Sequence, residues 1–339
     1  MYELWRLARG GVLLTAWAMA AGWPARRLAA RLRADGWQQV CRGVWAVPGK
    51  EVDWRVRAGA AQLLRPDLVC SHRTAAALHR IESLRGPGGG GSGAGGGNGG
   101  GREDPLEFTA RGSGGRRGGR AGEGGIRVYV TSRLADRDCG RRRGLRVTTP
   151  ARTVGDLIRA AEGREAAVVV ADSALSHRQV GALRRPPLVR PEELAVELAA
   201  PRRAGGPAAR RWLPLAVPGC GSPAETVARL RMGDAGLCPE TQPALRTPAG
   251  RALHPDFYFR DAGLVVEIEG FAYHGSRAAH ERDVRRFNDL QNCPGVRRVL
   301  RFTAREVFDH PGRMTATIRM ALAALTASGS DSELGSDSD

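Results

Sequence analysis

Residues 256–269 read as two short strands joined by a tight turn, and this pattern constrains the fold more than any other stretch. If the turn is centred on Asp261 and Ala262, the antiparallel register places Phe257 opposite Val266 and Asp256 opposite Glu267. Side chains alternate between the two faces of a strand. We therefore expect one apolar core face, formed by Phe257, Phe259, Leu264, Val266 and Ile268. The opposite face carries Asp256, Tyr258, Val265, Glu267 and Glu269.

Asp256 and Glu267 then lie directly across the hairpin from each other. Like charges in opposed strand positions are destabilising unless something neutralises them. A divalent cation such as Mg²⁺ or Mn²⁺ prefers oxygen ligands and would neutralise both carboxylates. The other interpretation is an ordinary wet sheet face whose acids have arginine partners. At this point of the argument both interpretations stay open.

The elements around this hairpin follow in a clear order. Ser222 is expected to cap a helix that has Pro223 in its first turn and Glu225 as the capping-box acid. Thr303 and Glu306 form a second capping box before the helix that closes the chain. Strands are expected at 241–247, 251–259, 264–270 and 296–302, and a helix at 276–292. The order is therefore helix, three strands, helix, strand, helix.

The first fifty residues predict three short helices followed by a hairpin. Thr15 is expected to cap the second helix, and Pro24 to open the third, which covers 25–35. Leu28 and Leu32 share the inner face of that third helix. Its arginines point outward, and a further arginine occupies the hairpin turn. These basic residues are Arg26, Arg27, Arg31, Arg33 and Arg42.

Helices followed by a two-stranded wing are typical of a winged helix-turn-helix, in which one helix enters the major groove of DNA. The plain alternative is that these arginines are only solvated. The whole chain has a net charge of +17 and a pI near 11.1, and Lys50 is its only lysine. Clustered cations attract phosphates, so the charge favours nucleic acid, and a winged helix favours double-stranded DNA over RNA. The six cysteines have no zinc-type spacing, which suits a reduced, cytoplasmic protein. No run is long enough for a membrane span.

Residues 255–269 also carry a nuclease-like motif. Pro255 and Asp256, then Glu267 and Glu269, match the P-D-x(n)-(D/E)-x-K pattern of restriction-endonuclease-like nucleases, except that Glu269 replaces the lysine. The sequence "HPDFYFRDAGLVVEIEGFAYHGSRAAHERDVRRFNDLQNCPGVRRVLRFTAREV" resembles a domain family related to very-short-patch-repair endonucleases (Vsr-like). The front of the chain, with "GVLLTAWAMAAGWPARRLAARLRADGWQQVCRGVWAVPG", "LVCSHRTAAALH" and "TTPARTVGDL", resembles the AbiEi-type antitoxin family. The N-terminal winged helix of that family binds DNA.

The endonuclease resemblance implies roles for particular residues. Asp256 and Glu267 would bind Mg²⁺ or Mn²⁺, with Glu225 as a further ligand unless it only caps its helix. Glu269 would be a ligand, or His274 or Arg277 would replace the lysine, or the domain no longer cuts. The implied catalytic residues are Asp256, Glu267, Glu269 and His274. Arg282 and Arg286 on the following helix would contact DNA phosphates, although a solvated helix face explains them equally well.

We therefore expect a multidomain α/β protein in which a winged helix binds duplex DNA and a Mg²⁺-dependent endonuclease domain cuts it. The alternative is an antitoxin-like transcriptional regulator with a catalytically inactive nuclease-like domain, for which a cognate toxin would be a second partner. The expected parts are a winged helix-turn-helix (1–50), a helical continuation (51–85), a glycine-rich flexible insert and loop (86–125), a middle α/β segment (126–215), a restriction-endonuclease-like α/β domain (220–325) and an acidic disordered tail (326–339).

Overall fold

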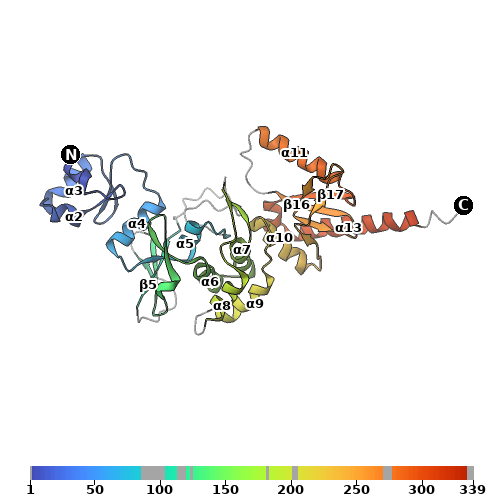
Figure 1. Ribbon diagram of the computed structural model, residues 1–339, viewed down its shortest axis with the longest axis horizontal. Coiled ribbons are helices and arrows are strands. Elements are labelled where there is room, and N and C mark those ends of the chain that lie inside the picture. The colour runs from blue at the N-terminus through green and yellow to red at the C-terminus, as the bar shows by residue number, and fades with distance from the viewer. Residues whose placement is uncertain are drawn as a thin grey trace. The chain divides into compact units, whose positions relative to one another are not determined.

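The computed structural model describes residues 2–84, 104–112, 120–122, 125–180, 183–200, 205–269 and 277–333. Most of the glycine-rich insert, and His274, lie outside these residues. The chain is mixed α/β and divides into two compact units (Figure 1). The first unit contains Met1–Arg80 and Gly100–Asp156, and the second contains Ile81–Arg85 and Leu157–Asp339. In the described part of the chain, no helix is both long and apolar enough to span a bilayer.

The first unit begins with three short helices and a three-stranded antiparallel sheet of order β1-β3-β2. The elements are α1 (Tyr2–Leu7), β1 (Val12–Leu14), α2 (Thr15–Ala20), α3 (Ala25–Ala34), β2 (Gln38–Cys41) and β3 (Val44–Ala46). The predicted helices and hairpin are present, and β1 adds a strand beside β3. Two start residues were wrong. Thr15 is the first residue of α2, where its N–H bonds to Gly43 of the hairpin, and Pro24 is the N-cap residue of α3.

A six-stranded sheet of order β6-β7-β5-β4-β9-β8 follows in the same unit. The strands and the helices beside them are α4 (Trp54–Leu64), β4 (Val69–Cys70), α5 (His72–His79), β5 (Leu106–Arg111), β6 (Arg120–Gly122), β7 (Ile126–Thr131), β8 (Cys139–Arg142) and β9 (Leu145–Thr148), with a 3₁₀ turn at Asp136–Asp138. Helix α6 (Pro150–Ala160) follows and crosses the boundary to the second unit. Ser71 occupies the N-cap position of α5, but its hydroxyl lies 3.0 Å from His72 Nδ1 and makes no capping bond. The His72 ring is buried and stacks on Tyr129 at 3.8 Å.

The second unit begins with helices that surround one buried acid. Its first elements are α7 (Arg164–Leu175), β10 (Arg178–Val180), β11 (Leu183–Arg185), α8 (Pro191–Ala199), α9 (Gly206–Trp212), a 3₁₀ turn at Leu213–Leu215 and α10 (Pro223–Asp234). The carboxylate of Asp172 on α7 is fully buried. It accepts hydrogen bonds from Thr226 Oγ1 at 2.9 Å, from an Arg229 amino group at 3.1 Å and from Val217 N–H at 2.8 Å. Asp172 therefore ties α7 to α10 and to the segment before it.

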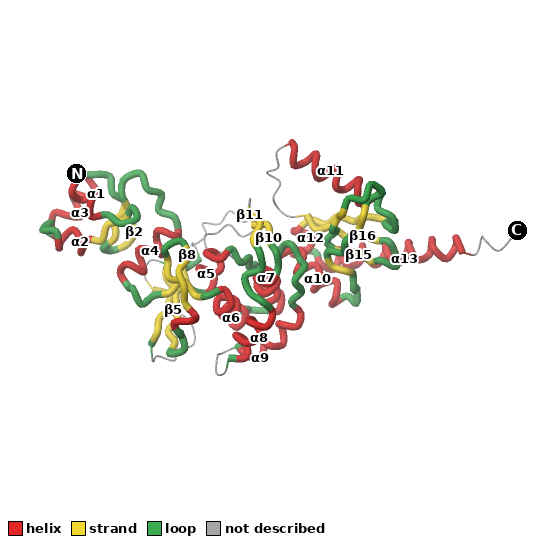
Figure 2. Tube along the Cα trace, viewed as in Figure 1, coloured by secondary structure: helices red, strands yellow, loops and turns green. Residues whose placement is uncertain are grey.

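A mixed four-stranded sheet, of order β12-β15-β16-β17, completes the second unit (Figure 2). The elements are β12 (Glu240–Thr241), β13 (Leu245–Arg246), β14 (Ala252–Leu253), β15 (Phe257–Phe259), β16 (Leu264–Glu269), α11 (Arg277–Gln291), β17 (Arg298–Thr303), α12 (Ala304–Asp309) and α13 (Pro311–Glu333). The predicted hairpin register is confirmed, because Phe257 pairs with Val266 and Phe259 with Leu264. The two predicted strands before β16 were too long. Each is divided in two, and β13 and β14 form a separate hairpin.

Only one face of this sheet was expected to be buried, but both faces pack against helices or loops. The expected core face is confirmed: Phe257, Leu264 and Val266 are fully buried with residues of α10, α12 and α13. On the other face Tyr258 and Val265 are also buried, in a second cluster with Leu245, Leu253, Leu290 and Cys293. The physical reason is that β16 and β17 are parallel, so the connecting helix α11 crosses over this face and covers it. The acids are therefore confined to one end of the face.

Candidate functional site

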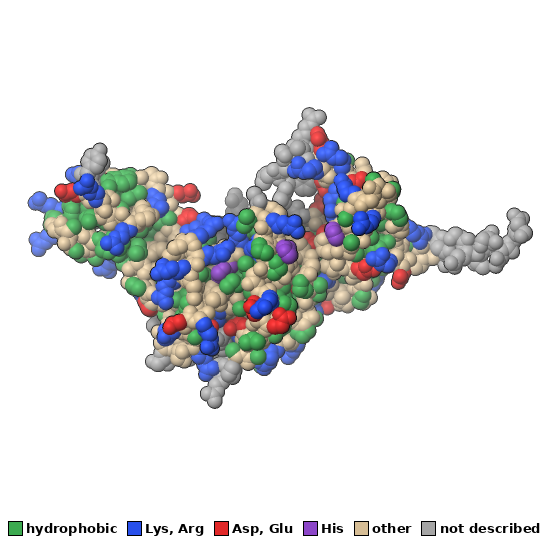
Figure 3. Space-filling view, in the orientation of Figure 1, with side chains coloured by type: hydrophobic (Ala, Val, Ile, Leu, Met, Phe, Trp, Pro, Cys, Tyr) green, Lys and Arg blue, Asp and Glu red, His purple; other side chains and the backbone are tan. Residues whose placement is uncertain are grey.

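Helix α3 presents arginines to solvent over an apolar inner face. Leu28 and Leu32 are at most 1% exposed, as predicted. The predicted basic positions on α3 and the β2–β3 turn are all exposed, namely Arg26, Arg27, Arg31, Arg33 and Arg42. Figure 3 shows basic side chains projecting from the surface over α2 and α3. Charge and exposure thus agree with a nucleic-acid surface, and DNA contact stays a prediction.

These arginines are not equivalent. Arg31 Nε lies 2.8 Å from Asp35 Oδ2, and the Arg33 guanidinium lies over the Trp45 ring at 5.3 Å. By contrast, the guanidinium groups of Arg26 and Arg27 make no hydrogen bond or ion pair with the described residues. Arg26 and Arg27 are therefore the most available cations of the helix.

In the second unit, Glu225, Asp256 and Glu267 come together from three elements through a short network. Gln242 Nε2 donates to Asp256 Oδ1 at 2.9 Å and to Glu225 Oε2 at 3.3 Å. The other oxygen of Asp256 accepts from Ile268 N–H at 2.8 Å, and Asp256 N–H donates to Glu267 Oε1 at 3.2 Å. The predicted proximity of Asp256 and Glu267 is therefore observed, and we call these three acids the carboxylate cluster.

Helix capping accounts for part of the role of Glu225. Ser222 Oγ accepts from Glu225 N–H at 3.2 Å, as expected for an N-cap serine. The Glu225 carboxylate accepts from Gly221 N–H at 2.5 Å, whereas a reciprocal capping box would direct it to Ser222 N–H. The predicted box is therefore shifted by one residue, and this shift leaves Glu225 facing Gln242.

Burial raises the pKa of every member of the carboxylate cluster, and repulsion from the other two acids adds to the effect at Asp256. For Asp256, burial raises the pKa well above its usual range, and the charges of Glu225 and Glu267 add to the effect. Burial also raises the pKa of Glu225, against the Gly221 hydrogen bond. Burial raises the pKa of Glu267 although the Arg286 guanidinium opposes it. The folded protein therefore favours protonation of these groups more than water does.

Arginines from neighbouring elements form ion pairs with Glu267 and Glu269. Arg286 on α11 donates to both oxygens of Glu267 at 3.2 and 3.3 Å, and to the His254 carbonyl at 2.8 Å. Arg301 on β17 lies 2.6 Å from Glu269 Oε1 and 2.7 Å from Asp283 Oδ2. Glu269 thus has a cationic partner of its own. Arg282 is exposed on α11, and the site predicted for His274 lies outside the described residues.

Within the described residues, no group of three or more His, Cys, Asp and Glu side chains is arranged to hold a metal ion. The donors around the carboxylate cluster give the physical reason. Both oxygens of Asp256 accept protein hydrogen bonds, and Glu267 is shared between Arg286 and a backbone N–H. In this arrangement the residues do not fit the predicted Mg²⁺ or Mn²⁺ centre. The arginine-partnered interpretation describes Glu267 and Glu269 better.

Comparisons with known proteins do not assign the chain to a family. A scan against models of protein families found no match to this sequence. A search of curated proteins found no significantly similar sequence. Functional inference for this protein therefore depends on its own residues and their arrangement.

Proposed function

We propose that this protein binds duplex DNA through the outer face of α3 and the β2–β3 turn. The observation that carries the proposal is the division of α3 into a buried leucine face and an exposed arginine face, on which Arg26 and Arg27 have no ionic partner in the described residues. In this proposal, residues 1–50 are a winged helix-turn-helix. Helix α3 enters the major groove, and Arg42 contacts the flanking backbone. The net charge of +17 supports the proposal, because phosphate neutralisation releases counterions.

For the second unit, the geometry favours a binding role within a DNA-binding regulator. The donors Gln242, Ile268 N–H and Arg286 already satisfy Asp256 and Glu267. Glu269 stands at the lysine position of the nuclease motif, and its carboxylate is paired with Arg301. In this proposal the hydrogen bonds of the carboxylate cluster connect α10 to the end of the sheet, and exposed Arg282 offers a phosphate contact.

Metal-dependent cleavage of DNA is the second candidate function. The observation that favours it is the convergence of Glu225 on α10, Asp256 just before β15 and Glu267 on β16, all with pKa values raised by burial. Perturbed carboxylates of this kind cluster at functional sites, although structural networks also produce them. Cleavage would require Gln242 and Arg286 to release their carboxylate partners.

Duplex binding is tested by fluorescence anisotropy with a labelled duplex and the matching single strand over a series of salt concentrations. We expect saturable duplex binding whose affinity falls steeply with salt, because each neutralised phosphate contributes about 0.9 to the log–log slope. Tighter binding to the single strand than to the duplex would contradict the groove proposal. So would an affinity that does not respond to salt.

Cleavage is tested separately with supercoiled plasmid in Mg²⁺, Mn²⁺ or EDTA. For the regulator we expect no more nicking with either metal than with EDTA, and no metal-dependent rise in melting temperature. Metal-dependent nicking that disappears in both Asp256→Asn and Glu267→Gln, but persists in the exposed-acid control Glu240→Gln, would establish the second candidate instead. The control carries the same loss of charge outside the carboxylate cluster.

A further inference from the structure

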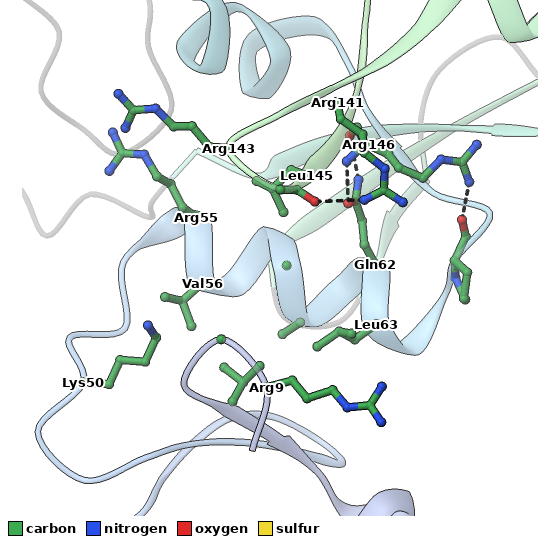
Figure 4. A pocket seen from close by; sticks show the side chains of 16 residues that line it. Arg9, Lys50, Arg55, Val56, Gln62, Leu63, Arg141, Arg143, Leu145 and Arg146 are labelled. Atoms are coloured by element: carbon green, nitrogen blue, oxygen red, sulfur yellow. Dashed lines mark hydrogen bonds between the residues drawn. The ribbon is translucent and has the colours of Figure 1, made fainter. Parts of the chain in front are cut away.

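A basic cavity lies in the first unit, apart from the exposed face of α3. It has a volume of about 550 Å³ and lies among β1, α4 and the β8–β9 turn (Figure 4). None of the described residues that line it is acidic. Six of them are cationic, namely Arg9, Lys50, Arg55, Arg141, Arg143 and Arg146. Asp53 pairs with one of these cations, Arg55, and the remaining net positive charge of the lining favours an anionic ligand.

The cavity also has an apolar floor, formed by side chains from all three of its walls. Val12 of β1 and Leu145 of β9 are nearly buried, and Val56 and Leu63 of α4 complete the surface. A protein surface that contacts only DNA phosphates needs positive charge and no apolar lining. Small-molecule pockets combine an apolar lining with a few placed polar groups. A volume of about 550 Å³ lies within the usual range for small-molecule sites.

Contacts within the protein hold β1, α4 and β9 together around the cavity. Gln62 of α4 accepts from Arg146 N–H at 3.0 Å and donates to the Arg146 carbonyl at 2.7 Å, so it joins α4 to β9 like a strand pair. Val12 and Ala60 belong to one buried apolar cluster, which joins β1 to α4. A preformed cavity binds its ligand without a further ordering cost.

Arg143 occupies an unusual backbone position at the mouth of the cavity. It has φ of +51° in the two-residue turn Arg143–Gly144 between β8 and β9. Such turns favour Asn or Gly at this position, because a longer side chain is strained at positive φ. The Arg143 side chain has no hydrogen-bond or ionic partner in the described part of the chain. A strained position thus carries an unpaired guanidinium.

Arg55 places a second guanidinium beside Arg143, and Lys50 lines another part of the same cavity. Figure 4 shows the guanidinium groups of Arg55 and Arg143 next to each other and pointing the same way. Arg55 donates one N–H to Asp53 at 2.9 Å, which leaves its other donors for a ligand. The stem of Lys50 passes over Gly11, where an added Cβ would lie only 2.7 Å from Lys50 Cδ. In a chain whose other basic residues are all arginines, the only lysine lines this cavity.

We propose that the cavity binds a small phosphorylated ligand of the nucleoside polyphosphate class. Arg55, Arg143 and Lys50 bind the phosphates, because guanidinium forks pair with phosphate oxygens and an ammonium adds a compact charge. The apolar floor takes the base. This site is independent of the DNA-binding proposal, because no residue of α3 or the β2–β3 turn lines it.

The first test is calorimetric titration of the full chain with ATP, adenosine and inorganic triphosphate. We expect saturable binding of ATP, weaker binding of triphosphate and weaker binding of adenosine. Arg143→Asn suits the positive φ, so it should fold at least as stably as the wild type while lowering ATP affinity about tenfold. The matched control Arg137→Asn removes one exposed arginine outside the cavity and should leave ATP affinity unchanged.

The second test uses the single lysine. An amine-specific reagent can modify Lys50 and the N-terminal amine, which peptide mass spectrometry separates. ATP should protect Lys50 and leave the labelling of the N-terminus unchanged, and Arg26→Ala/Arg27→Ala should show the same protection.

Absence of both ATP binding and Lys50 protection would overturn the proposal. If inorganic triphosphate bound as tightly as ATP, the base would contribute nothing to binding, and the proposed base site on the apolar floor would be wrong. Displacement of ATP by a short duplex, with duplex affinity lowered in Arg143→Asn, would show a DNA phosphate contact instead.

Discussion

Replacing Arg26 and Arg27 together by Ala should lower the affinity for duplex DNA roughly 50-fold at about 0.1 M salt. Two lost phosphate contacts reduce the log–log salt slope by about 1.8, which gives this loss when extrapolated from 1 M salt. Both side chains are exposed and have no ionic partner within the described residues, so they have no internal contact to lose. Anisotropy titrations at several salt concentrations measure the slope and the affinity in one series.

Adding Arg31→Ala and Arg33→Ala should have a smaller further effect on DNA binding. Arg31 is paired with Asp35 and Arg33 lies over Trp45, so each must give up an internal contact to bind phosphate. A matched control is Arg210→Ala/Arg211→Ala, which removes two adjacent exposed arginines from α9 in the second unit. An equal loss of slope in this control would show that net charge, and not α3, governs binding.

Asp256→Asn should stabilise the protein near neutral pH by up to about 1 kcal/mol, the scale of an interaction between charges in opposed strand positions. The folded-state pKa of Asp256 is raised by burial and by the charges of Glu225 and Glu267. An acid with a raised pKa contributes its full stability below its unfolded pKa, near 3.9, and loses it as pH rises through the folded pKa. The variant avoids this loss. Its advantage should therefore be present at pH 7–8 and vanish towards pH 4.

Thermal or urea unfolding over this pH range measures the effect. Glu267→Gln should give a smaller gain, because it also removes the partner of Arg286. Glu240→Gln is the control, since the pKa of Glu240 is lowered by its bond to Arg260 and its loss should give no gain at neutral pH. A lower melting temperature for Asp256→Asn at pH 7–8 would show that its bonds from Gln242 and Ile268 outweigh the repulsion.

The local features of this fold were predictable from the sequence. The hairpin register from Phe257 to Val266 and the buried pair Leu28 and Leu32 agree with the structure. The capping box of Thr303 and Glu306 is also present, but it opens the short helix α12 and not the closing helix α13. Each depends on residues close together in the chain, where turn length, side-chain periodicity and cap chemistry act directly. The start of α2 was wrong because β1 takes Thr15 into contact with the hairpin, which is a longer-range interaction.

The surroundings of the acids were decided only by the tertiary structure. Alternation places Glu267 and Glu269 on one face, but it does not show that α11 covers that face or that Arg286 and Arg301 reach these two acids. Gln242, which joins Glu225 to Asp256, has a positive φ that its own sequence context does not indicate. The basic cavity likewise combines Lys50 and Arg55 with Arg9 and Arg143, which lie far from them in the chain. Such groupings follow from packing between elements, and local residue patterns carry no information about which distant elements will pack together.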